Sequence, residues 1–277
     1  MTPTAVVTPP ATSATKRGEH VSFAQIDQYL RCPLRYSFVY IDHLEPDFVP
    51  AARAFGSGIH AAAAYFFRGA AQGKLPVVED VQGHFEALWS LETQAQPLRF
   101  GEKETKESLR DLAMRMLVVL HREFDPRTEV LAVEEPFRVP LVDPDTGEVL
   151  DRDLVGTVDL LERDAERRLV VVDLKTAARK YSDLHVDASL QLSVYSYAMS
   201  LGPHAGEDDI HLRFDVLTKT KQPELCRYWT TRDRAANVRL YRLASEVLRA
   251  IEAGAFHPIV GWQCKDCPFR SKCWAWG

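Results

Sequence analysis

The spacing of apolar residues divides the chain into a helical first part and a second part rich in strands. After Ser22 and Gln25, which resemble a helix-capping box, the apolar positions predict a short helix that Pro33 helps to end. The same helical spacing predicts longer helices over residues 54–72, 77–92 and 103–123. Residues 19–125 are therefore expected to form a mostly helical segment.

Strand patterns begin near residue 129. The segments EVLAVEEPFRVPL, LVGTVDLLE and RLVVVDL are separated by turn sequences, which predicts antiparallel strands joined by hairpins. A helix is expected over about 186–200, followed by strands near IHLRFDVLT and ELCRYWT. A last long helix over about 231–253 should stop at Gly254, since glycine is favoured just past a helix end.

The two ends of the chain lack such periodicity. Residues 1–18 are rich in Thr, Ala and Pro and are expected to be a disordered tail. Residues 257–277 are also aperiodic and contain three of the five cysteines. The chain is thus expected to form a single domain over 19–277, with a helical part (19–125), a core (126–256) and a cysteine-rich tail (257–277).

The composition and charge of the chain mainly exclude classes of function. The formal net charge is −5, so no global basic field attracts nucleic acid, and such a contact would need a local patch or a bound metal. No apolar run reaches membrane-spanning length and no leader opens the chain, which favours a cytoplasmic protein without a membrane partner. No phosphate-binding GxxxxGK[ST] sequence is present, which argues against a nucleotide-driven motor.

The most apolar expected strand ends in charges. Asp173 and Lys175 are two residues apart and share one strand face, and a hairpin could bring Asp159 beside Asp173. Adjacent carboxylates repel unless a cation lies between them, and oxygen ligands favour Mg²⁺ or Mn²⁺ over zinc. With the ammonium group nearby, the set suits phosphodiester hydrolysis by metal-activated water. The alternative is an ion pair with unrelated acids at a solvent-exposed strand end.

Four short motifs then point to a known family. They are Gly58–His60 (GIH), Gly156–Asp159 (GTVD), Val172–Lys175 (VDLK) and Gln191–Tyr195 (QLSVY). In this order they resemble the PD-(D/E)XK nuclease superfamily, in particular its RecB-type branch of AddB-like and CRISPR-adaptation-associated exonucleases. Val158 replaces the proline of the superfamily's name, a departure that is common in this branch. The resemblance implies an α/β (α+β) restriction-endonuclease-like core, with a mixed central sheet flanked by helices.

The resemblance also implies roles for individual residues. The metal ligands would be His60, Asp159, Asp173 and the Leu174 backbone carbonyl. Lys175 would be the catalytic lysine. Gln191 and Tyr195, four residues apart on one helix face, would orient Lys175 or the substrate phosphate, although they could equally form a half-buried polar face.

Cys264, Cys267 and Cys273 have a spacing that can wrap one metal centre. Spacing alone does not choose a fourth ligand among Cys32, Cys226 and His257, although Cys226 is most simply a small core residue. Iron–sulfur members of the RecB-type branch carry one cysteine in an N-terminal C-P-x-x-Y segment, as at Cys32–Tyr36, and three near the C terminus. The resemblance therefore implies a structural [4Fe–4S] cluster, with structural zinc as the alternative. The implied ligands are Cys32, Cys264, Cys267 and Cys273.

Basic and aromatic residues alternate near the C terminus. Lys265, Arg270 and Lys272 lie among Trp262, Trp274 and Trp276. Such a pattern can hold a single nucleic-acid strand by charge and base stacking. The interpretation that we favour from the sequence is a tail that covers the cluster with its tryptophans packed inward.

The resemblance thus implies a metal-dependent deoxyribonuclease, an exonuclease on single-stranded or end-frayed DNA. Its rivals are a non-cleaving DNA-end-binding or scaffolding protein, and an enzyme that acts on RNA, since no feature of the sequence reads a 2′-hydroxyl. Integrase-like partners would indicate CRISPR adaptation, and helicase partners would indicate DNA repair. The sequence does not choose between these pathways and a mobile element.

Overall fold

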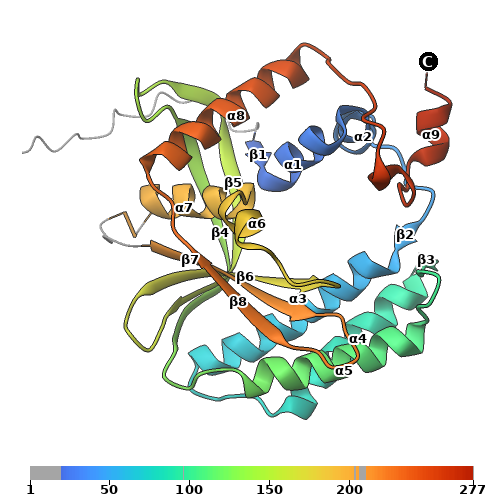
Figure 1. The fold of residues 1–277 in the computed structure, drawn as a ribbon, viewed down its shortest axis with the longest axis vertical. Helices are drawn as coiled ribbons and strands as arrows, with labels where there is room; N and C mark the ends of the chain where they lie inside the picture. The colour runs from blue at the N-terminus through green and yellow to red at the C-terminus, as the bar shows by residue number, and fades with distance from the viewer. Residues whose placement is uncertain (1–19, 96, 203, 206–209, 277) are drawn as a thin grey trace, which may run out of the picture.

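The computed structural model describes residues 20–95, 97–202, 204–205 and 210–276 (Figure 1). The expected disordered tail, residues 1–18, lies outside the described residues. The helices are α1 (Phe23–Arg31), α2 (Pro33–Tyr36), α3 (Ala51–Ala71), α4 (Val78–Ala95), α5 (Lys106–Arg122), α6 (Asp183–Asp187), α7 (Leu190–Leu201), α8 (Arg234–Glu252) and α9 (Arg270–Trp274), with a π-helical turn at Ser37–Ile41 and a 3-10 turn at Trp262–Cys264. The strands are β1 (His20–Ser22), β2 (Val49–Pro50), β3 (Leu98–Arg99), β4 (Glu129–Val142), β5 (Val149–Arg163), β6 (Leu169–Ala177), β7 (Ile210–Thr218) and β8 (Leu225–Thr230).

One mixed sheet forms the centre of the protein. Its strands lie in the order β1-β5-β6-β7-β8, and β4 pairs with β5 as well. The pairs β4–β5, β5–β6 and β7–β8 are antiparallel, whereas β6–β7 and β1–β5 are parallel. The expected hairpins are therefore confirmed, and the parallel step from β6 to β7 is made by a crossover through α6 and α7.

Helices cover both faces of this sheet (Figure 1). On one face α3, α4 and α5 bury a core that includes Phe55, Phe66 and Leu117. On the other face α1, α6, α7 and α8 bury a second core that includes Ile26 and Leu192. A mixed sheet between two helical layers is the expected α/β restriction-endonuclease-like architecture, which the structure confirms.

The sheet forks along β5. One edge of β5 pairs with β4, while the other edge pairs with β6 at residues 160–163 and with β1 at residues 153–155. Gly156 to Asp159 lie between these two pairings, and no strand of the described residues pairs with them on that edge. Buried backbone N–H and C=O groups are costly when unpaired. Side chains must therefore complete the hydrogen bonding at the fork.

Several predicted helix ends are confirmed, and one predicted helix is wrong. Ser22 and Gln25 form a reciprocal capping box, and Gly254 follows α8 with a left-handed φ of 67°. The single helix expected over 186–200 is two helices, because Ser189 has an extended backbone and caps α7 through the Leu192 N–H. Among the described helices, none combines the length and apolarity that crossing a membrane requires.

The C-terminal tail folds back on the N-terminal helices (Figure 1). The Leu34 N–H donates to the His257 carbonyl at 3.0 Å, and the Asp47 N–H donates to the Pro268 carbonyl at 2.7 Å. The rings of Phe38 and Phe269 pack with 6.0 Å between their centroids. These contacts hold the tail beside the segment that leads into α3.

Candidate active site

Asp173 and Lys175 extend from the same face of β6, as their spacing predicts. The Asp173 carboxylate is fully buried, and its Oδ2 lies 2.6 Å from Lys175 Nζ. That oxygen nevertheless accepts no hydrogen bond of good geometry. The ammonium group therefore balances its charge but does not fill its role as a hydrogen-bond acceptor. A buried carboxylate oxygen in this condition is costly unless a cation or a proton reaches it.

Two side chains of α7 hold this pair in place. Lys175 Nζ donates to Gln191 Oε1 at 2.8 Å, and Gln191 Nε2 donates to the Tyr195 hydroxyl at 3.0 Å. The Tyr195 hydroxyl lies 3.2 Å from Asp173 Oδ1 and 3.0 Å from the Thr157 carbonyl, which belongs to the sheet fork. Its one proton serves one of these acceptors at a time. Gln191 and Tyr195 thus close a ring that fixes the carboxylate relative to the ammonium group.

Asp159 completes the hydrogen bonding of the fork. Its Oδ2 accepts a hydrogen bond from the Leu174 N–H at 2.9 Å, in the place of a ladder partner on β5. Gly156 leaves space for the Phe137 ring, because a Cβ at this position would lie 2.5 Å from that ring. Phe137 uses this space to meet Tyr195 edge-on, with 6.2 Å between ring centroids. The GTVD motif therefore builds the site through backbone geometry as well as through its carboxylate.

His60 reaches the same place from α3. Its Nδ1 lies 3.4 Å from Asp159 Oδ2. Burial lowers the pKa of His60, an effect that the negative charge of Asp173 partly opposes. The ring is therefore neutral near pH 7 and can offer a nitrogen lone pair to a cation.

A small cavity of about 20 Å³ lies between α3 and the sheet, with room for one ion or water. Its polar lining is His60, Glu134, Asp159 and Asp215. Sequence reasoning missed Glu134, which faces Asp159 across β4 and β5 and has a left-handed φ of 51° that residues with side chains adopt rarely. It pairs with Arg68 of α3. The available signal was the pair of glutamates in the strand opposite GTVD.

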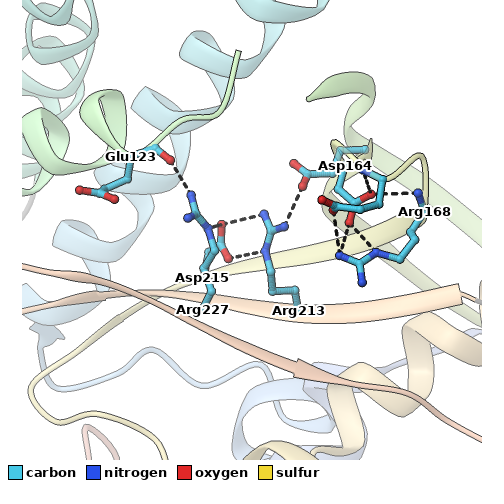
Figure 2. Close-up of polar contacts among 8 residues, drawn as sticks. Glu123, Asp164, Arg168, Arg213, Asp215 and Arg227 are labelled. Atoms are coloured by element: carbon cyan, nitrogen blue, oxygen red, sulfur yellow. Dashed lines mark hydrogen bonds and ion pairs between the residues drawn. The ribbon is translucent and has the colours of Figure 1, made fainter. Parts of the chain in front are cut away.

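A buried ion network borders this cavity on β7, and sequence reasoning missed it as well (Figure 2). Arg213 contacts both oxygens of Asp215 at 2.6 and 3.0 Å, and its Nη1 lies 2.8 Å from Glu162 Oε1. Arg227 lies 3.8 Å from Asp215 and donates to the Glu123 carbonyl at 2.6 Å. Since Asp215 also lines the site cavity, the network forms one of its walls. The available signal was the R-F-D spacing in IHLRFDVLT, the same two-residue step as D-L-K.

A further residue that the sequence did not reveal is Arg232, which anchors the start of α7. Its Nη2 donates to the Val186 and Ser189 carbonyls at 3.0 and 3.2 Å, and its Nε donates to Ser193 Oγ at 2.9 Å. These bonds tie the end of α6 to the first turn of the helix that carries Gln191. No local pattern marks Arg232, because its partners lie some forty residues earlier in the chain.

Burial and the neighbouring Asp173 raise the pKa of Asp159 to about 7. Because this folded-state value exceeds the ordinary value of 3.8, the metal-free folded protein keeps a proton that the unfolded chain releases between about pH 4 and pH 7. The free energy of unfolding should therefore fall as pH rises through this window. We expect a loss of about 1–3 kcal/mol between pH 5 and pH 8 in EDTA, a discounted figure because Asp159 is partly exposed.

Urea denaturation at the two pH values measures this loss. Asp159→Asn should remove most of it and should stabilise the metal-free protein at pH 8. The matched control is Asp153→Asn, since Asp153 is an exposed carboxylate that pairs with Arg138 on the same strand pair. A pH dependence that is unchanged in Asp159→Asn would contradict the assignment of the proton to this carboxylate.

The chemistry of these side chains suits a hard divalent cation. Asp173 has an oxygen without a directed donor, Asp159 is a carboxylate opposed by a like charge, and His60 is neutral. Within the described residues, no three His, Cys, Asp or Glu side chains are arranged to hold a metal ion as they stand. The residues therefore supply the oxygen and nitrogen donors that a divalent cation needs. Binding of the cation would have to draw these side chains closer together.

Four of the five cysteines gather where the tail meets the N-terminal helices. Cys32, Cys267 and Cys273 pack against one small apolar cluster. Burial raises the pKa of the Cys273 thiol, and Cys32, Cys267 and Cys264 add to the effect. Cys226 lies instead on β8 and packs against the core beneath α1, α6, α7 and α8. The structure thus groups Cys32, rather than Cys226, with the three tail cysteines.

The tail tryptophans do not pack inward, so that expectation is wrong. The exposed fractions of Trp262, Trp274 and Trp276 are 86%, 78% and 49%. The space that they were expected to fill is occupied by Phe38, Phe269 and the cysteines. The rings therefore project from a tail that is itself anchored.

Comparison with known proteins agrees with this architecture. The family model of the PD-(D/E)XK nuclease superfamily matches residues 20–274. The crystal structure of a presumed exonuclease from Eubacterium rectale is similar with a TM-score of 0.57 and 13% identity, and the alignment covers 92% of this chain and 88% of that chain. A structure of SSO0001 aligns over 91% of this chain and 95% of that chain, but at a TM-score of 0.35 and 13% identity it carries no argument. No curated protein matches significantly.

At 13% identity the Eubacterium rectale structure supports the fold alone. The family match supports membership as well as fold, because it spans the helix of His60, the strands of Asp159 and Asp173, and the helix of Gln191. The finer resemblance to the RecB-type branch stays a prediction. On the extent of the family match, the chain belongs to the PD-(D/E)XK nuclease superfamily.

Proposed function

We propose that this protein is a metal-dependent exonuclease that hydrolyses single-stranded or end-frayed DNA. The observation that carries the proposal is the ring of Asp173, Lys175, Gln191 and Tyr195 at the sheet fork, with Asp159 and His60 beside it. Superfamily membership supports a nuclease. The name of the Eubacterium rectale protein, a presumed exonuclease, supports removal of nucleotides from an end.

The residues of the site would divide the work of hydrolysis. His60, Asp159, Asp173 and the Leu174 carbonyl would hold Mg²⁺ or Mn²⁺, which when bound supplies polarisation of the phosphate and a water of lowered pKa. Lys175 would direct its ammonium group at the attacking water or at the charge that develops on the phosphate. Gln191 and Tyr195 would keep Lys175 at its position. No side chain needs to form a covalent intermediate.

The test is degradation of labelled linear single-stranded DNA, duplex DNA and circular single-stranded DNA with Mn²⁺ or Mg²⁺. We expect loss of linear single strands from an end, survival of circles, and no activity in EDTA. Degradation of circles would make the enzyme an endonuclease, and a preference for labelled RNA would change the substrate class. Inertness toward all four substrates, with DNA binding retained, would favour the non-cleaving scaffold.

We also propose that Cys32, Cys264, Cys267 and Cys273 hold a structural [4Fe–4S] cluster that joins the tail to the N-terminal helices. The packing of Cys32, Cys267 and Cys273 around Phe38 and Phe269, with Cys264 near enough to affect the pKa of Cys273, supports the proposal. Four thiolates suit zinc as well, so zinc on the same cysteines is the second candidate. Either centre would stabilise the tail, because metal binding adds directly to folding free energy.

Protein purified without oxygen is expected to be brown. Cys→Ala at any of the four positions should abolish the colour and destabilise the protein by several kcal/mol, because the clamp between tail and helices is lost. Cys226→Ala is the matched control and should keep both colour and stability, since Cys226 lies on β8. Visible absorption and metal analysis decide the outcome. A colourless protein with one zinc per chain would replace the cluster by zinc.

The pathway would be set by the proteins with which this enzyme works. We propose a cytoplasmic enzyme that works with integrase-like proteins in CRISPR adaptation or with helicases in DNA repair. Gene neighbourhood discriminates between these, because adjacent integrase-like genes favour the first and adjacent helicase genes favour the second.

A further inference from the structure

The C-terminal tail carries an exposed aromatic surface that has no part in the site described above. We define this tail surface as Trp262, Trp274 and Trp276 with the neighbouring Ile259 and Val260. Their exposed fractions run from 38% to 86%. All five belong to one segment of eighteen residues, and several large apolar side chains exposed in so short a segment indicate an interaction site more strongly than a single exposed one does.

The exposure of these rings does not come from a loose chain end. The tail is anchored by the hydrogen bond from the Asp47 N–H to the Pro268 carbonyl at 2.7 Å. Ser271 Oγ and Lys272 Nζ bond the Asp47 carboxylate at 2.5 and 2.7 Å. Phe269, between these contacts, is buried. The tail surface therefore presents its rings from a held scaffold, which lowers the entropy that a ligand would have to remove.

The charge of this segment is opposite to that of the chain. Residues 257–276 contain the basic residues Lys265, Arg270 and Lys272 and the acidic residue Asp266, so 3 − 1 gives +2, against −5 for all 277 residues. Lys265 and Arg270 are exposed. Lys265 lies 3.9 Å from Glu102, but both are more than three-quarters exposed and their pairing is weak. Two basic side chains thus remain accessible in the same segment as the aromatic rings.

The tail surface also lies near the start of the helix that enters the site. Asp47, which holds α9, precedes α3 by four residues, and Figure 1 shows α9 beyond β2, the strand that leads into α3. His60 is nine residues beyond Ala51, about 14 Å along the helix axis. The helix that carries His60 therefore starts from the segment that holds the tail.

We infer that the tail surface binds single-stranded DNA by stacking bases on Trp262, Trp274 and Trp276, while Lys265 and Arg270 contact phosphates. The inference rests on the proposed function and adds to it a place where the substrate is held away from the scissile bond. Indole rings interleaved with cations match a polyanion that has π faces. Protein–protein interfaces also use tryptophan and arginine, but their centres are poor in lysine, so the interleaved cations, Lys265 among them, are what favour a polyanion here. The surface thus favours a nucleic acid over a protein.

Fluorescence polarisation of a labelled oligothymidylate in EDTA, where no hydrolysis occurs, tests the inference. Stacking contributes roughly 1–3 kcal/mol per base, so Trp262→Ala with Trp274→Ala should weaken binding by at least about tenfold. The double Trp→Phe variant should retain most of the affinity, whereas the double Trp→Leu variant should behave like alanine. The matched control is Leu91→Ala on α4, which removes a side chain that is 64% exposed and outside the tail.

The outcomes separate this inference from the proposed function. A wild-type protein that binds and cleaves DNA, with Trp→Ala variants of unchanged affinity, overturns the tail surface and leaves the nuclease intact. Full binding of the oligothymidylate by the Trp→Leu variant overturns stacking, because leucine offers no aromatic face to a base. Loss of binding in Trp→Ala and Trp→Leu alone, with folding unchanged by circular dichroism, supports the inference.

Discussion

Asp173→Asn is expected to slow DNA cleavage by about 10³-fold or more while the protein stays folded. Asparagine keeps the size of the side chain and an oxygen for the Tyr195 hydroxyl, which lies 3.2 Å from Asp173 Oδ1. It removes the negative charge that would hold the cation and that faces Lys175 at 2.6 Å. It also removes the like charge that raises the pKa of Asp159. The free energy of unfolding of the metal-free variant should therefore lie within about 1 kcal/mol of that of the wild-type protein.

Lys175→Ala should have an effect of similar size for a different reason. It leaves the carboxylates to bind the cation but removes the ammonium group that Gln191 holds at 2.8 Å. Lys175→Arg should not restore activity, because a planar guanidinium cannot occupy the position of a compact ammonium. Lys74→Ala, an exposed lysine beyond the end of α3, is the control. Initial rates with Mn²⁺ measure the effect, and near-wild-type rates in both variants would rule out this site as the catalytic one.

Much of this site could be predicted because its spacing is local. Asp173 and Lys175 share a face of β6 by the two-residue period of a strand, and Gln191 and Tyr195 share a face of α7 by the four-residue period of a helix. The structure joins the two pairs through the contact between Lys175 and Gln191. Periodicity predicts which side chains point together, whereas the packing of α7 on the sheet decides that the two faces meet.

The fork in the sheet could not be predicted in the same way. It depends on β1, three residues at the start of the described chain, pairing with β5 more than 130 positions later. Nothing local in His20–Ser22 indicates such a partner. The fork nevertheless explains the site, because the free edge at Gly156–Asp159 leaves the Leu174 N–H and the Thr157 carbonyl to side chains. The residues that complete the sheet are the ones proposed to perform hydrolysis.

The tail was misjudged because exposure is decided by competition for space. Three tryptophans beside expected metal ligands suggested inward packing, yet Phe38 and Phe269 fill that interior. Sequence periodicity carries no information in an aperiodic segment of this kind. The same limit explains why Cys32 could be joined to the tail cysteines only by resemblance, whereas the structure brings them together.

Arg213→Ala is expected to be the most destabilising substitution considered, at about 3–5 kcal/mol. Arg213, Glu162 and Asp215 are each at least nine-tenths buried, and the arginine bonds both carboxylates. Burial already raises the pKa of Glu162, and Arg213 is the main opposing influence. Without the guanidinium Glu162 would lose its hydrogen-bonded cation, and Asp215 would keep only Arg227 at 3.8 Å, so Glu162 would take up a proton or the region would open. Thermal and urea denaturation measure the loss.

The pH dependence of this loss identifies its cause. Since loss of the guanidinium should raise the pKa of the buried Glu162 further above its unfolded value, the variant regains stability as pH falls, and the defect should be smaller at pH 5 than at pH 8. Adding Glu162→Gln and Asp215→Asn to Arg213→Ala should restore part of the stability, because no buried charge then remains. Arg167→Ala removes an exposed partner of Glu129 and should change stability by less than about 1 kcal/mol. A loss of equal size in both single arginine variants would show that the buried network in Figure 2 contributes no more to stability than an exposed ion pair does.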